Sequence, residues 1–313
     1  MKISKQDSKK YGFLFFKGTM MGAADVVPGV SGGTIAFIMG IYDQFVAAIN
    51  SINIDAFRLL FKGKIREAFS RVHLSFLIPL GLGISFSIIS LAKLVTWLIT
   101  KYPVYVWSFF FGLIIASSWF VVKEIGRIKI PVIISLALGF IFAWLIVGII
   151  PVSSPDNWYF TVFAGAISII AMVLPGISGS FILLLIGQYE RIMTAVKSLQ
   201  LSTMATFSLG SALGILSFSR LLGYLLNKHR EVTMAMLAGF MMGSLRKVWP
   251  YKEILEIKIV GGKEIPIKSI NVLPGNMDGS FFFALMCAIS GIVLVFVLEG
   301  ISGSMKGDQD ETA

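Results

Sequence analysis

The chain has 313 residues, of which 56% are hydrophobic and 14% are charged, and its mean hydropathy is +0.84. Soluble domains carry about 25% charged residues, so the composition excludes an ordinary soluble protein and indicates several membrane spans of about 20 residues each. The net charge of +10 does not indicate a nucleic-acid partner, because most Lys and Arg residues lie in short loops, where they set membrane orientation.

A single cysteine, Cys287, lies within an apolar run, which excludes an intrachain disulfide. The sequence contains no P-loop, His-Glu-x-x-His motif, nucleophile elbow or Rossmann fingerprint. We therefore predict no metal site, no cofactor, no enzymatic activity and no ATP-driven transport within this chain.

In chain order, a basic tail precedes an interrupted apolar hairpin at 11–50 and a loop at 51–72 that is rich in Lys and Arg. The positive-inside rule places this loop in the cytoplasm, and the tail also reads as cytoplasmic. Three spans follow, and a second interrupted hairpin with three more spans completes the chain. The predicted segments are about 74–100, 103–122 and 131–150 in the first half, and 158–198, about 204–226, 232–248 and 279–300 in the second. Residues 249–278 alternate around a Gly-Gly turn and predict a small β-hairpin outside the membrane.

The first hairpin is interrupted by helix-breaking residues between Ala24 and Thr34. Pro28 removes a backbone donor and disfavours helix in the residue before it. The glycines that follow tolerate tight turns. Ser31 can then cap a new helix that runs to about Asn50.

A similar helix-breaking segment occurs 147 residues later, between Ala171 and Ser180. Over residues 24–52 and 171–199, 11 of 29 aligned positions are identical, against roughly two to four expected by chance, so the chain contains an internal repeat. A second alignment, at an offset of 127, extends the repeat through the spans and pairs Lys93 with Arg220.

The duplication divides the chain into an N-terminal repeat, 1–155, and a C-terminal repeat, 156–313. Each contains a re-entrant, broken-helix hairpin followed by three transmembrane helices. A hairpin returns to its own side and three spans cross an odd number of times, so the second repeat must be inverted relative to the first. We therefore predict an all-α polytopic membrane protein built from two inverted repeats, an arrangement typical of transporters.

Inverted copies would bring the two interruptions face to face near the middle of the membrane, where broken helices line a cavity or are buried in protein. Each new helix start offers free amides and about half a positive charge, which suits a phosphate. The expected free amides are those of Gly32, Gly33 and Thr34 and of Gly179, Ser180 and Phe181. The full predicted substrate-binding set is Pro28, Gly29, Ser31, Gly32, Gly33, Thr34, Pro175, Gly176, Ser178, Gly179, Ser180, Lys93 and Arg220.

Charged residues inside apolar segments are the other candidates. An unpaired Lys93 or Arg220 costs at least about 2.5–3.5 kcal/mol there, so each either snorkels to the interface or binds an anionic ligand, and their matching positions favour the ligand. Asp25 either accepts hydrogen bonds from nearby amides or binds a coupling proton or sodium ion. Asp43 and Glu190, near the hairpin ends, are either solvated charges or further coupling groups.

The stretch from Gly22 to Ala36, with its second copy from Leu174 to Ser180, resembles the PopT family of polyprenyl-phosphate transporters. The resemblance covers about residues 10–300. It implies that the chain moves undecaprenyl phosphate, the C55 lipid carrier for cell-wall glycans, from the outer to the inner leaflet of the bacterial plasma membrane. It assigns the headgroup site to the two motifs, which differ from each other at Met172 and Ser180.

The residues alone fit a lipid-phosphate flippase in which the headgroup crosses inside the protein while the tail stays in the bilayer. A transporter or channel for a small soluble anion would use the same site closed to lipid. A lipid phosphatase would need a nucleophile with a neighbouring base, and a scaffold would leave the duplicated breaks unexplained. Coupling to H⁺ or Na⁺ and assembly as a homodimer remain open.

Overall fold

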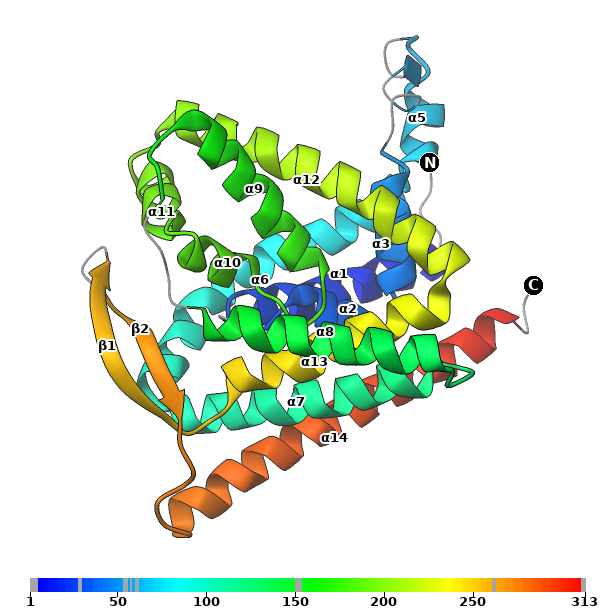
Figure 1. Cartoon of the computed structure of the whole chain (residues 1–313). Coiled ribbons are helices and arrows are strands. Elements are labelled where there is room, and N and C mark those ends of the chain that lie inside the picture. The colour runs from blue at the N-terminus through cyan, green and yellow to red at the C-terminus, as the bar shows by residue number, and fades with distance from the viewer. Residues whose placement is uncertain are drawn as a thin grey trace.

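The computed structural model describes residues 5–27, 30–52, 56, 58–59, 62–149, 154–260 and 263–310 (Figure 1). The first half contains α1 (Lys5–Asp25), α2 (Gly32–Ile38), α3 (Tyr42–Asn50), α5 (Ile65–Arg71), α6 (Leu74–Lys101), α7 (Pro103–Lys123) and α8 (Ile130–Gly148). The second half contains α9 (Trp158–Val173), α10 (Gly179–Leu185), α11 (Tyr189–Lys197), α12 (Leu201–Lys228), α13 (Arg230–Val248), β1 (Lys252–Val260), β2 (Lys263–Asn271) and α14 (Gly279–Asp310).

Helix boundaries in the two halves follow the sequence repeat. α10 and α11 begin and end 147 residues after α2 and α3, and α12 begins and ends 127 residues after α6. Helix packing follows it too, because α1 packs against α6 as α9 packs against α12, and α7 packs against α14 as α13 packs against α8. The two halves therefore have matching secondary structure and matching neighbours.

The matching helix pairs pack through glycines at matching positions. A β-carbon on Gly18 of α1 would lie 2.1 Å from the Leu80 carbonyl oxygen of α6, and one on Gly165 of α9 would lie 2.2 Å from the Phe207 carbonyl oxygen of α12. Real β-carbons essentially never approach an atom so closely. Glycine thus lets these backbones touch, as small residues do in membrane helix pairs generally.

The structure corrects the prediction of one continuous helix from Ser31 to Asn50. Ser31 does cap α2, since its side chain accepts a hydrogen bond from the Gly33 amide, but α2 ends at Ile38 and α3 leaves it at a bend of 120°. Gly40 at this bend has φ +63°, a left-handed conformation that glycine adopts without strain. Gly187 makes the equivalent turn between α10 and α11, with φ +69°.

The chain is a multi-pass membrane protein. Among the described helices, five are long and apolar enough to cross a membrane, and α2 with α3 meets the same criterion only as a bent pair. The five segments are Leu74–Leu91, Pro103–Lys123, Ile130–Gly148, Leu201–Lys228 and Gly279–Gly300. The predicted span at 232–248 forms α13, which is not among them. It packs between α7 and α8, so most of its surface meets protein and its sequence can be less apolar.

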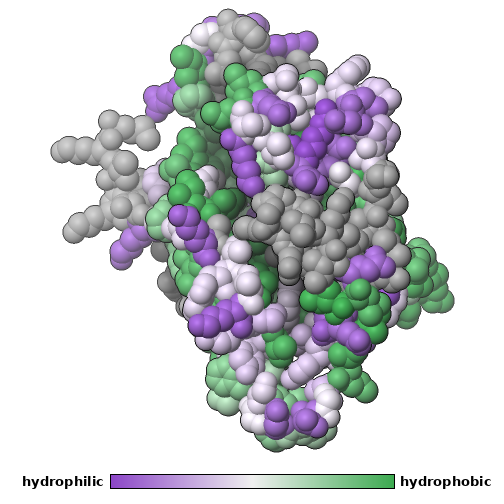
Figure 2. All heavy atoms as spheres, turned by 90° about the vertical axis from the view of Figure 1, so that its left-hand side faces the viewer, coloured by the Kyte–Doolittle hydropathy of each residue, from purple (hydrophilic) through white to green (hydrophobic). Residues whose placement is uncertain are grey.

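The predicted β-hairpin at 249–278 is confirmed. β1 and β2 pair antiparallel, with Lys252 opposite Asn271 at the open end. Figure 1 places this hairpin at one end of the molecule and both chain termini at the other. Figure 2, which looks at the hairpin end, shows polar residues scattered over it and apolar residues at its flanks.

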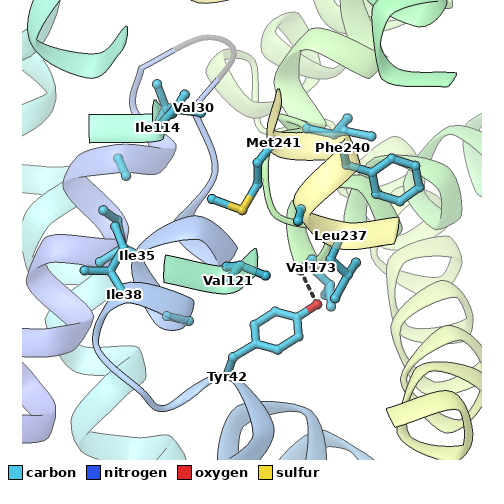
Figure 3. Close-up of a cluster of buried hydrophobic side chains, with 14 of the residues drawn as sticks. Val30, Ile35, Ile38, Tyr42, Ile114, Val121, Val173, Leu237, Phe240 and Met241 are labelled. Atoms are coloured by element: carbon cyan, nitrogen blue, oxygen red, sulfur yellow. Dashed lines mark hydrogen bonds between the residues drawn. The ribbon is translucent and has the colours of Figure 1, made fainter. Parts of the chain in front are cut away.

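Buried apolar side chains from both halves form one core around the two interruptions. Val30, Ile35 and Tyr42 of the first hairpin lie opposite Val173 of α9 and Met241 of α13 (Figure 3). The interruptions are therefore held in the interior rather than at the surface.

Candidate functional site

The two interruptions contact each other directly, as the sequence predicts. The Ser31 hydroxyl donates a hydrogen bond of 2.9 Å to the Met172 carbonyl oxygen. The Gly176 amide donates one of 3.1 Å to the Thr34 hydroxyl oxygen. The Tyr42 hydroxyl adds a third, of 3.1 Å, to the Val173 carbonyl oxygen (Figure 3). Side chains of the first half thus satisfy backbone groups that the second half's interruption leaves without a helical partner.

The first interruption is closed by its own residues. The Gly32 amide donates to the Asp25 carboxylate at 2.7 Å, the Gly33 amide donates to the Ser31 hydroxyl oxygen at 3.1 Å, and the Thr34 amide donates to the Ser31 carbonyl oxygen at 3.0 Å. The expectation of three free amides is therefore wrong for this copy. Its physical reason is that the Asp25 carboxylate and the Ser31 cap take the positions that a bound anion would take.

Of the predicted residues in this interruption, Ser31, Gly32, Gly33 and Thr34 are all buried. Pro28 and Gly29 lie outside the described residues. Asp25 makes the hydrogen bond to a nearby amide that was one of its two expected roles.

The second interruption differs in detail although its motif is the same. Pro175, Gly176, Ser178 and Gly179 are buried, and Gly176 has φ +87°. The Ser178 side chain makes no cap and instead shares a hydrogen bond of 2.9 Å with the Ser180 hydroxyl. Within the described part of the chain, the amides of Gly179, Ser180 and Phe181 have no acceptor.

The residue that closes the first interruption has no equivalent in the second. A β-carbon on Gly32 would lie 2.6 Å from an Asp25 carboxylate oxygen, and one on Gly179 would lie 2.6 Å from the Met172 side chain. Met172 therefore occupies the place of Asp25, but a thioether is at best a weak acceptor. Among the described residues, no acceptor takes the place of Asp25 at the amides of the second copy.

A small pocket with a cavity volume of about 10 Å³, room for about one water molecule, lies beside the second interruption. Its lining comes from α8, the interruption itself, α10 and α13. The lining residues include Ala143, Val147, Gly176, Ser178, Phe181 and Lys247. The Lys247 ammonium lies 4.2 Å from the centre of the Phe181 ring, a favourable cation–π distance. The pocket therefore combines one hydroxyl-bearing residue, Ser178, with a positive charge.

Sequence reasoning missed Lys247. It lies one residue before the end of α13, in a segment read as a membrane span. One signal was available in the sequence. Arg246, Lys247 and Lys252 lie where the predicted span 232–248 meets the loop after it, and the positive-inside rule would leave an outer loop free of basic residues.

The β-hairpin is attached to the end of α13 that carries Lys247. The Lys252 ammonium donates to the Lys247 carbonyl oxygen and lies 4.8 Å from the Trp107 ring centre. The Trp249 indole donates to the Val272 carbonyl oxygen at 2.9 Å. Burial and, to a smaller extent, the charge of Lys247 lower the pKa of Lys252 to about 7. The two lysines thus form one basic cluster in surroundings of low polarity.

Lys93 and Arg220 are not brought to the interruptions. Both side chains are exposed, on α6 and α12, and no hydrogen bond or ion pair to the described residues is found for either. Asp43 makes an ion pair of 2.8 Å with Arg230, the first residue of α13. Glu190 is exposed at the start of α11. These four groups lie apart from the contact between the two interruptions.

Another buried lysine, Lys17, was also missed. It lies within α1 and donates a hydrogen bond of 2.7 Å to the Met39 carbonyl oxygen, at the end of α2. A cation at a helix C-terminus is stabilised by the unpaired carbonyls there. Lys17 thus stabilises the first hairpin internally, which distinguishes it from Lys247.

Comparison with known proteins gives the chain a family. Residues 21–265 match the family described as undecaprenyl phosphate translocase-like. The chain is 42% identical over 292 residues to a polyprenyl-phosphate transporter of Vibrio cholerae, covering 91% of this chain and 95% of the relative. It is 33% identical over 255 residues to a polyprenyl-phosphate transporter of Staphylococcus aureus, covering 75% and 84%. No solved structure matches it. With most of its length matched, the chain belongs to the undecaprenyl phosphate translocase-like family.

Proposed function

We propose that this protein moves undecaprenyl phosphate from the outer to the inner leaflet of the bacterial plasma membrane, where the carrier is reused in cell-wall synthesis. The observation that carries the proposal is the direct contact between two interrupted helical segments inside a multi-pass membrane protein. The names of its relatives support the same substrate class.

The physical requirement for such a transporter is to replace the water around a phosphate. Burying an unpaired phosphate in hydrocarbon would cost tens of kcal/mol on a Born estimate. Open amides, hydroxyls and a lysine at the second interruption supply donors and a positive charge for the headgroup. The long apolar tail can remain in the bilayer, since many side chains along α6, α8 and α14 are exposed and apolar.

We assign the headgroup to the predicted residues of the two interruptions, with unequal roles. The second copy supplies donors to the headgroup through Gly179, Ser180 and Ser178. The first copy holds the second interruption in place through the hydrogen bonds of Ser31 and Thr34. Lys93 and Arg220 are exposed on apolar helices. They are therefore better placed to contact a lipid headgroup before it enters the protein than to bind it inside. Because Asp25 is fixed by the Gly32 amide, release of that bond on protonation would link ion binding to movement of α2.

The proposed orientation has the N-terminus in the cytoplasm and the β-hairpin on the outer side. Both termini lie at the end of the molecule opposite to the hairpin (Figure 1), and the loop before α6 carries Arg58, Lys62, Lys64, Arg66 and Arg71, which the positive-inside rule assigns to the cytoplasm. In this orientation the two repeats are inverted, and movement of one against the other would expose the site to each leaflet in turn.

A reconstitution experiment tests the proposal. Proteoliposomes with a fluorescent polyprenyl phosphate in both leaflets are treated with an impermeant quencher, and the rate at which lipid becomes accessible is followed. We expect the protein to accelerate exchange of the phosphate lipid but not of a neutral polyprenol. Ser178→Ala should slow exchange, while Ser290→Ala, whose hydroxyl bonds only within α14, should not. Exchange at the rate of protein-free vesicles would rule out the function.

The alternative is a transporter for a small soluble anion, which the small size of the pocket also fits. Uptake of radioactive inorganic phosphate into the same vesicles, without any movement of lipid, would favour it.

A further inference from the structure

Lys247 is a mostly buried cation without an anionic partner. The ion pairs found among the described residues are Lys64–Glu67, Arg191–Asp156 and Arg230–Asp43, and none of them involves Lys247. Its ammonium lies over the Phe181 ring, which stabilises the charge but does not neutralise it. Removing an unpaired charge from water is unfavourable, so the arrangement calls for an anion that binds there.

The groups that line the small pocket beside Lys247 suit such an anion. The pocket is bounded by Lys247, by Ser178 and Gly176 of the second interruption, and by Ala143 and Val147 of α8. A hydroxyl and an ammonium thus face the same opening, and the remaining walls are apolar. Charge-assisted hydrogen bonds to phosphate oxygens are among the strongest in proteins. One polar side and several apolar sides match a phosphate that is attached to a hydrocarbon chain.

Neighbouring charge strengthens the case. Lys252 of the β-hairpin bonds to the Lys247 backbone, and no carboxylate of the described residues pairs with either lysine. By contrast, Lys17 of the first half has a carbonyl partner at the end of α2. The uncompensated positive charge is therefore found beside the second interruption and not beside the first.

We propose that Lys247, together with Ser178, forms the subsite that binds the phosphate monoester headgroup, at the β-hairpin end of the molecule. This inference rests on the proposed function and adds to it the residue that pairs with the headgroup charge. Lys247 takes the role that the sequence assigned to Lys93 and Arg220. In the proposed orientation the subsite opens toward the outer leaflet, where the carrier must be captured.

The test measures binding of farnesyl phosphate, a short polyprenyl phosphate, and of inorganic phosphate to the full-length protein in nanodiscs. Lys247→Met should weaken farnesyl phosphate binding about tenfold or more, as expected for loss of a charged hydrogen bond. Lys247→Arg should restore most of it. Lys101→Met is the matched control, because Lys101 also lies over aromatic rings but is exposed and does not line the pocket.

Each outcome separates the inference from the function. Unchanged binding in Lys247→Met, with wild-type lipid exchange in vesicles, would overturn the subsite and leave the function intact. Absence of binding and exchange in the wild type would overturn both. Equal affinity for inorganic phosphate and farnesyl phosphate would overturn the assignment to a lipid headgroup. Monodisperse elution of Lys247→Met and a thermal unfolding midpoint close to that of the wild type show that lost binding is not lost folding.

Discussion

The two interruptions share a Pro-Gly-x-Ser-Gly motif but differ in how their polar groups are satisfied. In the first, the Gly32 amide bonds to Asp25 and the Gly33 amide bonds to Ser31. In the second, Met172 replaces Asp25 and the Ser178 side chain makes no cap. A pocket with Lys247 lies beside the second copy. The comparison teaches that one duplicated motif can be closed by its own side chains in one half and keep amides without an acceptor in the other, where we propose that the headgroup binds.

The largest expected effect comes from separating the two interruptions. A β-carbon on Gly33 would lie 2.7 Å from the Val173 carbonyl oxygen, across the contact between the halves. Gly33→Ala should therefore destabilise the protein by about 3 kcal/mol, as overpacking does, and abolish lipid exchange. The measurements are thermal unfolding in detergent and vesicle exchange. Gly12→Ala, in open space on α1, is the control, and equal behaviour of the two variants would contradict the close contact.

Converting the second interruption to the first should remove its anion site. Met172→Asp places a carboxylate where Asp25 lies in the first copy, within reach of the Gly179 amide. We expect farnesyl phosphate binding to fall about tenfold, since the carboxylate competes for the same donors, while thermal stability is kept. Binding by the wild type and by Met172→Asp is compared by titration in nanodiscs. Undiminished affinity would show that the headgroup is bound elsewhere.

Removing the Asp25 carboxylate from the first interruption should lower the stability of the protein more than it lowers phosphate binding. Asp25→Leu leaves the Gly32 amide buried without its acceptor, at a cost of about 1–3 kcal/mol. Asp25→Asn keeps a carbonyl oxygen at that position and should cost less. Unfolding midpoints of the two variants give the comparison directly. If Asp25→Asn were as destabilising as Asp25→Leu, the charge of Asp25 and not its acceptor oxygen would be what closes the first interruption.

The smallest expected effect is the difference between the two equivalent serines. Ser31→Ala loses both the cap on the Gly33 amide and the bond to the Met172 carbonyl oxygen, and should cost about 1–2 kcal/mol of stability. Ser178→Ala loses only its bond to Ser180 and should cost less than about 1 kcal/mol. Its main effect should be on lipid exchange. Thermal unfolding and vesicle exchange of both variants distinguish a structural serine from a binding one.

Much of the fold could be read from the sequence because it depends on local patterns. Apolar runs set the six predicted spans, whose helices begin within three residues of their predicted starts, and alternation around a Gly-Gly turn gave the β-hairpin. The bend between α2 and α3 was missed, although Gly40 and Gly187 were aligned identities. Nothing in a single sequence states that these glycines adopt a left-handed conformation rather than continue a helix.

The site was predicted only in part. The contact between the two interruptions followed from the duplication, but their unequal chemistry did not. Asp25 was recognised as the residue without a counterpart, yet whether its carboxylate met an amide, a proton or a metal ion depended on the fold. Lys247 was overlooked because it is 69 residues from Ser178 in the sequence, and only packing of α13 against the second interruption, where a β-carbon on Gly176 would lie 2.8 Å from Met241, brings the two beside one pocket.

By itself, the sequence determined that this chain is a membrane protein with two copies of an interrupted hairpin, since hydropathy and helix-breaking residues act over short distances. The tertiary structure decided which copy is closed and which is open. Hydrogen bonds and unpaired charges between distant segments depend on where whole helices pack, and that packing is fixed by the glycine contacts and the shared core rather than by any single motif.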